Sequence, residues 1–276
     1  MAIQALSSQS ISQQAIGVMD SGVGGISVLK HIHALLPHES LMYVADSKYA
    51  PYGSKTVAEI TARCMIIADF LMSKNVKALV VACNTATAAA IDELRETFNI
   101  PIIGMEPAVK PAAEASKNGV IGVLATVGTL KSAQFAALLE SYGRNVKVVT
   151  QACGGLVECI ERGELHTEAT RQLLKKYCAP LLAEGADTIV LGCTHYPFVR
   201  PLIEAILQED GVGNDVAIID TGAAVAKQLQ KKLAEQDLLE TANNPADIGF
   251  WTNSQAPNAA QVIEQLWGEK AEVKVL

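Results

Sequence analysis

The feature that most constrains the fold is a regular alternation of short apolar runs with stretches of helical character. Nine runs rich in aliphatic and β-branched residues are predicted as strands: 15–20, 41–46, 78–83, 101–105, 120–126, 146–153, 188–193, 216–220 and 248–253. Helices are predicted between most of them, over 25–36, 56–74, 87–97, 131–141, 168–184 and 221–235. Strands that alternate with helices indicate an α/β fold with mostly parallel sheets.

The amino-acid composition is typical of a folded, globular protein. Half of the 276 residues are hydrophobic and 18% are charged, which argues against disorder. No apolar run approaches the roughly 18–20 residues that a membrane helix needs, and the high apolar content is explained by strands covered on both faces. Residues 1–14 lack the features of a secretory signal. We therefore expect a cytoplasmic protein with these residues as a flexible or loosely docked lead-in.

Charge and cysteine usage exclude several classes of partner. The net charge is −7 and no block of lysine and arginine is present, which argues against binding of nucleic acid or of an anionic membrane. An anionic small molecule stays open, because the potential of a pocket can differ from that of the whole chain. The six cysteines, at positions 64, 83, 153, 159, 178 and 193, form no CxxC pair and no metal-type spacing, so they are predicted as free thiols.

The chain reads as two related halves. Each half has a turn punctuated by glycine or threonine, DSGVGG at 20–25 and ATVGT at 125–129, and later a cysteine at a strand end, Cys83 or Cys193. Crossings are predicted at 101–111 and near 220–222, which separate a domain of residues 15–106 plus 222–276 from a domain of residues 107–221. Ligands bind at the carboxyl ends of strands in open α/β sheets, so the candidate site is the cleft between the two copies.

The two strand-end cysteines carry the strongest functional signal. A single cysteine there is most simply a small buried apolar side chain. Here polar residues follow each cysteine at once, in ACNT and in GCTH, and a position beside backbone N–H groups at the start of a helix favours the thiolate. Two thiols on opposite faces of one carbon suit a stereoinversion, in which one removes a proton and the other returns it. A thiol, with an ordinary pKa of about 8.5, can serve as base or acid.

Other polar residues near the predicted strand ends have structural as well as functional interpretations. The DSGVGG turn is a weak phosphate-loop signal, since it lacks the full GxGxxG pattern and a Walker lysine. Asp20 and Ser21 are candidates to orient or deprotonate a thiol, and the backbone amides of the turn are candidates to hold a carboxylate. His195 is either a structural histidine or a proton-transfer partner of the cysteine two residues before it. Taken alone, APYG at 50–53 is an ordinary loop.

Together the motifs DSGVGG, APYG, ACNTAT, ATVGT and GCTH resemble those of the glutamate racemases, over residues 16–223. The resemblance implies two similar doubly wound, flavodoxin-like α/β domains with pseudo-twofold symmetry and an active site in the cleft between them. It implies an enzyme without cofactor or metal that interconverts L- and D-glutamate and supplies D-glutamate for peptidoglycan. It leaves open a homodimer and a response to a peptidoglycan precursor.

The resemblance also implies roles for individual residues. Cys83 and Cys193 match the catalytic pair, with Asp20 near the first and His195 near the second. Cys83 would act on D-glutamate and Cys193 on L-glutamate. Substrate contacts are implied at Asp20, Ser21, Tyr52, Gly53, Asn84, Thr85, Thr126, Thr129, Thr194 and His195.

Two assignments stay open. A further acid of the family lies on the helix after the sixth strand, where the spacing to the second cysteine favours Glu161, with Glu158 as its rival. The rival functions are a racemase of the same superfamily acting on aspartate or a related acid, and a module that binds a small ligand without catalysis, because fold alone does not establish chemistry. A redox switch at the thiols is a third interpretation.

Overall fold

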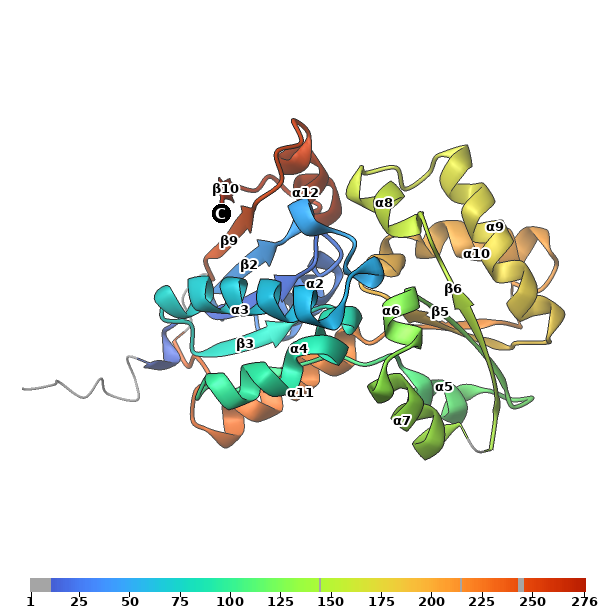
Figure 1. The fold of residues 1–276 in the computed structure, drawn as a ribbon, viewed down its shortest axis with the longest axis horizontal. Coiled ribbons are helices and arrows are strands. Elements are labelled where there is room, and N and C mark those ends of the chain that lie inside the picture. The colour runs from blue at the N-terminus through green and yellow to red at the C-terminus, as the bar shows by residue number, and fades with distance from the viewer. Residues whose placement is uncertain (1–10, 144, 214, 243–245) are drawn as a thin grey trace, which may run out of the picture.

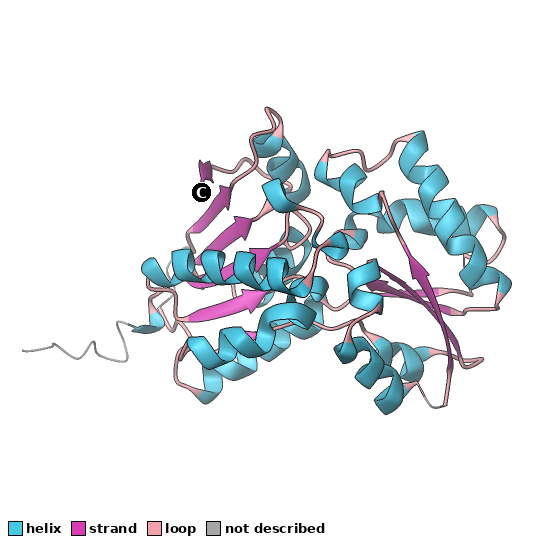
Figure 2. Cartoon of the chain, viewed as in Figure 1, coloured by secondary structure: helices cyan, strands magenta, loops and turns pink. Residues whose placement is uncertain are grey.

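The chain folds around two parallel β-sheets (Figure 1, Figure 2). The structure is a computed structural model that describes residues 11–143, 145–213, 215–242 and 246–276, so that residues 1–10 of the predicted lead-in lie outside the described residues. The first sheet has the order β10-β9-β2-β1-β3-β4 and the second has the order β6-β5-β7-β8. The strands are β1 Ile16–Asp20, β2 Leu41–Ala45, β3 Ala78–Val81, β4 Ile102–Ile103, β5 Val120–Ala125, β6 Lys147–Ala152, β7 Thr188–Gly192, β8 Ala217–Ile219, β9 Ile248–Thr252 and β10 Val273–Val275.

The two sheets share one strand order. In the first, β2-β1-β3-β4 are consecutive neighbours, and in the second β6-β5-β7-β8 repeat the same sequence of first, second, third and fourth strand. All of the neighbouring pairs are parallel. The predicted α/β class with two doubly wound sheets is therefore confirmed. In such sheets the chain reverses its direction of travel between the first and third strand, and that switch point opens a crevice at the carboxyl ends.

The helices cover the faces of both sheets (Figure 1). Around the first sheet they are α2 Ile26–Leu35, α3 Val57–Ser73, α4 Asn84–Thr97, α11 Gly222–Glu235 and α12 Ala259–Trp267. Around the second they are α5 Val109–Ala115, α6 Val127–Leu130, α7 Ala133–Tyr142, α8 Leu156–Glu161, α9 Glu168–Ala183 and α10 Arg200–Glu209. Short 3₁₀ turns, η1 Ser47–Tyr49, η2 Tyr52–Ser54 and η3 Tyr196–Val199, follow β2 and β7.

Several of these elements were not among the predicted strands and helices. Helices α5, α6, α10 and α12 and strand β10 lie in segments without a predicted element. In α5 the predicted crossing at 101–111 extends over Pro111, which lies in the first turn of the helix, and α10 likewise has Pro201 in its first turn. A proline there is tolerated because the first N–H groups of a helix have no intrahelical acceptor. Strand β10 is short and lies at the edge of the sheet, where the apolar signal is weak.

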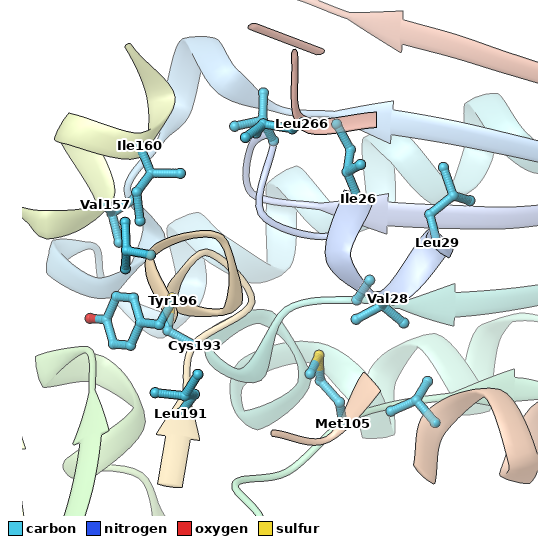
Figure 3. Packing of buried hydrophobic residues seen from close by; sticks show 14 of the residues in the cluster. Ile26, Val28, Leu29, Met105, Val157, Ile160, Leu191, Cys193, Tyr196 and Leu266 are labelled. Carbon is cyan, nitrogen blue, oxygen red and sulfur yellow. The ribbon is translucent and has the colours of Figure 1, made fainter. Parts of the chain in front are cut away.

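One hydrophobic core runs through both halves. The same buried cluster contains Ile26 and Leu29 of α2, Val157 and Ile160 of α8, and Tyr196 after β7 (Figure 3). Helix α8 therefore shares a buried core with residues of α2 although more than a hundred positions separate them in the sequence. This packing sets the loops at the carboxyl ends of the second sheet against the first half, and it positions the site described below.

The described end of the lead-in docks through a buried cation. The Lys77 ammonium donates to the Ser12 carbonyl and lies 2.5 Å from Glu39 Oε2, and all three residues are buried. A buried charge needs such partners, since water no longer solvates it. Among the described residues no helix has both the length and the apolar character to cross a membrane.

Candidate active site

The structure brings Cys83 and Cys193 to one small cavity. Cys83 follows β3 and Cys193 follows β7, the third strands of the two matching strand orders. Both cysteines line this cavity and are nearly fully buried. Of the predicted site residues it is lined by Ser21, Tyr52, Gly53, Cys83, Asn84, Thr85, Thr126, Cys193, Thr194 and His195. Asp20, Thr129 and Glu161 do not line the cavity. Each is hydrogen-bonded to a residue that does: Asp20 to Ser21, Thr129 to Thr126 and Glu161 to His195.

The Cys83 thiol is held at the start of α4. Its Sγ donates to Ser21 Oγ at 3.6 Å and accepts the N–H of Ala86 at 3.4 Å. Burial nevertheless raises the pKa of Cys83 well above its ordinary value, and the nearby Asp20 charge raises it further, although both hydrogen bonds act in the opposite direction. The turn acts as expected, because the N–H of Ala86 lowers the pKa of Cys83, but the net shift is upward. The helix terminus supplies the predicted donor, but loss of water outweighs it.

Asp20 reaches Cys83 through Ser21. The Ser21 hydroxyl donates to Asp20 Oδ1 at 3.4 Å, and Asp20 Oδ2 accepts the N–H of Gly25 at 2.8 Å. Burial raises the pKa of Asp20 above its ordinary value, partly offset by the positive charge of His195. Among the described residues no hydrogen bond joins Asp20 directly to the Cys83 sulfur. The geometry therefore fits an orienting role of Asp20 through the Ser21 hydroxyl.

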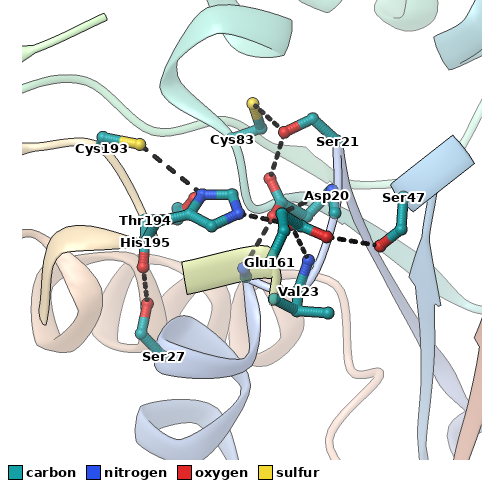
Figure 4. A network of polar contacts seen from close by, with 12 residues as sticks. Asp20, Ser21, Val23, Ser27, Ser47, Cys83, Glu161, Cys193, Thr194 and His195 are labelled. Carbon is teal, nitrogen blue, oxygen red and sulfur yellow. Dashed lines mark hydrogen bonds and ion pairs between the residues drawn. The ribbon is translucent and has the colours of Figure 1, made fainter. Parts of the chain in front are cut away.

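A second polar network holds Cys193 (Figure 4). Its Sγ lies 3.7 Å from His195 Nδ1, and His195 Nε2 lies 2.6 Å from Glu161 Oε1. An ionised carboxylate only accepts, so Nε2 donates to Glu161 and Nδ1 faces the sulfur. Burial by itself lowers the pKa of His195, but the bonds to Cys193 and Glu161 raise it well above its ordinary value. The ring is thus suited to hold a proton beside the sulfur.

The geometry separates the two candidate acids. Glu161 is the last residue of α8, and besides His195 it binds the first half: Oε1 accepts the N–H of Val23 at 2.7 Å and Oε2 accepts the Ser47 hydroxyl at 2.8 Å. Glu158 instead lines a neighbouring cavity. Glu161 is the acid that lies beside the histidine, whereas the catalytic role itself remains a prediction.

The glycines of DSGVGG are explained by close packing. A Cβ on Gly22 would lie 1.9 Å from Glu161 Oε1, and one on Gly24 would lie 2.3 Å from His195 Nδ1. The backbone amides of this turn bind two carboxylates of the chain itself, Glu161 at the N–H of Val23 and Asp20 at the N–H groups of Gly22 and Gly25. The phosphate-loop interpretation does not fit, because a side chain of the protein occupies the position that a phosphate would take.

Three threonine hydroxyls join the halves at the other side of the cavity. Thr85 Oγ1, on α4, lies 2.8 Å from Thr126 Oγ1 and 3.1 Å from Thr129 Oγ1. Thr126 also caps α6 by accepting the N–H of Thr129 at 3.2 Å. This cluster brings together residues that the sequence assigned to separate motifs.

Asn84 has unused hydrogen-bonding capacity inside the cavity. Both its Oδ1 and its Nδ2 are buried and have no hydrogen-bond partner among the residues that the structure describes. An amide of this kind is unfavourable unless a ligand satisfies it. Because Asn84 lines the cavity between the two cysteines, it offers one donor and one acceptor to a polar ligand there.

The sequence did not single out the residues that anchor this site from β2. Asp46 is fully buried and accepts the Tyr52 hydroxyl at 2.5 Å and two N–H groups of Arg63, at 2.7 and 3.0 Å. Ser47 follows it and binds Glu161. The available signal was position: like Asp20, Asp46 lies where a predicted strand ends. In the described part of the chain no group of His, Cys, Asp and Glu side chains is arranged to bind a metal ion.

Comparison with known proteins places the chain. Residues 16–229 match the sequence profile of the Asp/Glu/Hydantoin racemase family. The chain belongs to this racemase family. Glutamate racemase from Ectopseudomonas mendocina is 55% identical over 96% of this chain and 98% of its own length. The resemblance to glutamate racemases is thereby confirmed.

Solved structures of the same racemase family agree with the fold. Glutamate racemase isoform RacE1 from Bacillus anthracis superposes with a TM-score of 0.85 at 35% identity, covering 96% of this chain and 98% of that chain. Escherichia coli glutamate racemase, in complex with L-glutamate and the activator UDP-MurNAc-ala, gives a TM-score of 0.82 at 29% identity, covering 95% and 98%.

Proposed function

We propose that this chain racemises glutamate, interconverting the L and D enantiomers by proton transfer between two cysteines, and so supplies D-glutamate for peptidoglycan. The observation that carries the two-base mechanism is the pair Cys83 and Cys193 at equivalent strand ends, lining one cavity. The identity to glutamate racemases along nearly the whole chain supports the substrate. No cofactor enters the proposal.

The mechanism assigns one cysteine to each enantiomer. With L-glutamate, Cys193 as thiolate removes the α-proton and becomes a thiol, and Cys83 as thiol gives its proton to the opposite face and becomes a thiolate. With D-glutamate the roles are exchanged. His195 stabilises the Cys193 thiolate as an imidazolium at Nδ1, because its raised pKa favours the charged ring. Ser21, whose hydroxyl donates to Asp20, accepts the S–H of Cys83 and so orients the thiol.

The remaining lining residues would bind the substrate and stabilise the carbanion. The unpartnered amide of Asn84 is proposed to bind a substrate carboxylate, together with the hydroxyls of Ser21, Thr85 and Thr194. Asn84 is also the first residue of α4, so N–H groups of that helix point toward developing negative charge. Low exposure of these groups strengthens each electrostatic interaction.

The direct test follows the circular dichroism of L-glutamate with pure protein and no added cofactor, beside Cys83→Ser and Cys193→Ser. We expect racemisation by the wild type, incorporation of solvent deuterium at the α-carbon, and severe loss of turnover in either variant. Near-normal racemisation by Cys193→Ser in both directions would show that the two-base mechanism is wrong.

The same assay tests which substrate the protein uses and whether the protein is an enzyme or a non-catalytic binding module. Comparison of rates on L-glutamate and L-aspartate distinguishes a glutamate racemase from a relative that acts on aspartate. Binding of glutamate without exchange of the α-proton would instead favour a non-catalytic binding module. Loss of activity on mild oxidation, restored by reductant, would support the thiols as a secondary redox switch.

We also propose the remaining organisation as follows. Residues 15–106 plus 222–276 form one domain and residues 107–221 the other, in a cytoplasmic protein for which a homodimer stays open. Light scattering of the purified protein measures the oligomeric state. A response to a peptidoglycan precursor is tested by assaying racemisation with and without UDP-MurNAc-alanine, the activator bound by the Escherichia coli relative.

A further inference from the structure

We propose that Ser47 is a positioning residue of the Cys193 half of the site: its hydroxyl holds Glu161 in the orientation that binds His195, and it does so only while the two halves are in contact. The inference rests on the proposed racemisation. Ser47 lies in η1, directly after β2, and its Oγ donates to Glu161 Oε2 at 2.8 Å (Figure 4).

The partners of Glu161 come from both halves. His195 belongs to the loop after β7, as does Cys193, whereas Val23 and Ser47 belong to loops after β1 and β2 of the first sheet. The carboxylate accepts from all three, at 2.6, 2.7 and 2.8 Å. Any motion that separates the sheets removes the two donors of the first half together and leaves the carboxylate with the imidazole alone.

The three donors do not bind the same oxygen of the Glu161 carboxylate. Oε1 is shared by His195 Nε2 and the Val23 N–H, while Oε2 is bonded by Ser47. A carboxylate bonded at one oxygen can still turn about its terminal torsion, which has broad minima. A donor on the second oxygen fixes that torsion, so Ser47 sets the direction in which Oε1 faces the ring.

Ser47 is itself firmly placed. The preceding residue, Asp46, donates its N–H to the carbonyl of Asp20 at 3.0 Å and is bound by both Arg63 and the Tyr52 hydroxyl. Its backbone is thus linked to the strand end that orients Cys83. A rigid hydroxyl loses little conformational freedom when it binds, which makes it effective for positioning.

Orientation of Glu161 matters for proton transfer at the sulfur. When Oε1 accepts from Nε2, Nδ1 is directed at Cys193 Sγ and can share a proton with it. With the carboxylate turned away, the ring loses the acceptor that sets its orientation and supports its charge. Loss of Ser47 should therefore slow proton transfer rather than weaken substrate binding.

A neighbouring interdomain bond supplies a matched control. Ser27 Oγ donates to the carbonyl of Thr194, also at 2.8 Å and also from the first half to the second, but it does not touch Glu161. Ser27→Ala removes one hydrogen bond between the halves and leaves the contacts of Glu161 intact. Ser47→Ala removes one hydrogen bond between the halves that is also the positioning contact of Glu161. Ser47→Thr keeps the hydroxyl, and Ser47 is only partly buried and lines a small cavity together with Glu161.

The experiment measures kcat and KM in both directions for wild type, Ser47→Ala, Ser47→Thr and Ser27→Ala, with α-protonated and α-deuterated glutamate. Enantiomers have equal free energies, so kcat/KM must agree in the two directions for every variant, which checks the data. We expect kcat for L-glutamate to fall roughly ten-fold in Ser47→Ala, the effect of one charge-assisted hydrogen bond, with a larger deuterium effect and little change in KM. Ser47→Thr should restore kcat.

The outcomes are decisive. Equal losses in Ser47→Ala and Ser27→Ala, a normal kcat in Ser47→Ala, or failure of a folded Ser47→Thr to restore kcat would each overturn the inference. Nitrogen-15 NMR of the His195 ring needs no turnover, and its signals should shift more in Ser47→Ala than in Ser27→Ala. A wild type that leaves L-glutamate unchanged would refute the proposed function, while the NMR comparison would still decide whether Ser47 positions the ring.

Discussion

Gly24→Ala should disable the Cys193 half of the site while leaving the fold intact. A Cβ at this position would lie 2.3 Å from His195 Nδ1, 2.6 Å from Cε1 and 2.7 Å from Cγ. Ordinary contacts begin at 3.4 Å, so the ring must retreat by about 1 Å. The backbone itself permits alanine, because Gly24 is not among the glycines with positive φ.

The size of the loss in kcat follows from the contacts that the His195 ring would lose. His195 is buried and already binds Glu161 at 2.6 Å, so retreat from the turn lengthens this bond or the 3.7 Å approach to Cys193. Misplacement of a reacting group by about 1 Å costs on the order of 100-fold in rate. We therefore expect kcat to fall by about that factor. The free energy of unfolding should fall by about 1–3 kcal/mol, the usual cost of overpacking a buried site, which leaves the protein folded.

The assay is racemisation of L- and D-glutamate by circular dichroism, with urea unfolding of each variant. Gly154→Ala is the matched control, since no heavy atom of the described chain lies within 4 Å of a Cβ built there. If Gly24→Ala retained wild-type kcat in both directions, then contact between His195 and Cys193 would not matter for turnover and the reasoning would fail.

Three further predictions concern other features. Lys77→Met should lower the free energy of unfolding by roughly 3–5 kcal/mol, measured in urea, because it leaves the buried Glu39 carboxylate without its cation; a change also of Glu39 to Leu should recover most of the loss. Burial raises the pKa of Cys64 and of Cys178 to about 12 from 9.0, so stability is fully present below about pH 9 and falls as pH rises toward 12; unfolding midpoints at pH 8 and 10.5 should differ, and less so in Cys64→Ala. Asn84→Ala should raise KM about ten-fold or more and make the substrate-free protein more stable by about 1 kcal/mol, since it removes two unpartnered buried polar atoms; a lower melting temperature with unchanged KM would contradict this.

The repeat of the two halves was accessible from the sequence because it depends on local signals. Buried parallel strands read as apolar runs, and their ends are marked by a change to polar residues. Cys83 and Cys193 could be matched for that reason. The elements that were missed have weak local signals instead, such as α10 with a proline in its first turn, or the short edge strand β10.

The partners of each catalytic candidate depended on the tertiary structure. Glu161 and Val23 are separated by 138 positions, and Glu161 and Ser47 by 114. Spacing to the second cysteine favoured Glu161 over Glu158, but only the tertiary structure shows that the carboxylate enters the turn where Gly22 leaves room and binds the N–H of Val23.

The sequence by itself determined the α/β class, the paired strand-end cysteines and the polar motifs around them, because each is written within a few consecutive residues. The tertiary structure decided the protonation preferences and the hydrogen-bonded order of the site. Burial outweighed the expected effect of the turn on Cys83, and the hydrogen bonds to Cys193 and Glu161 raised the pKa of His195. Desolvation and charge interactions depend on distances between distant segments, and those distances exist only once both sheets are packed together.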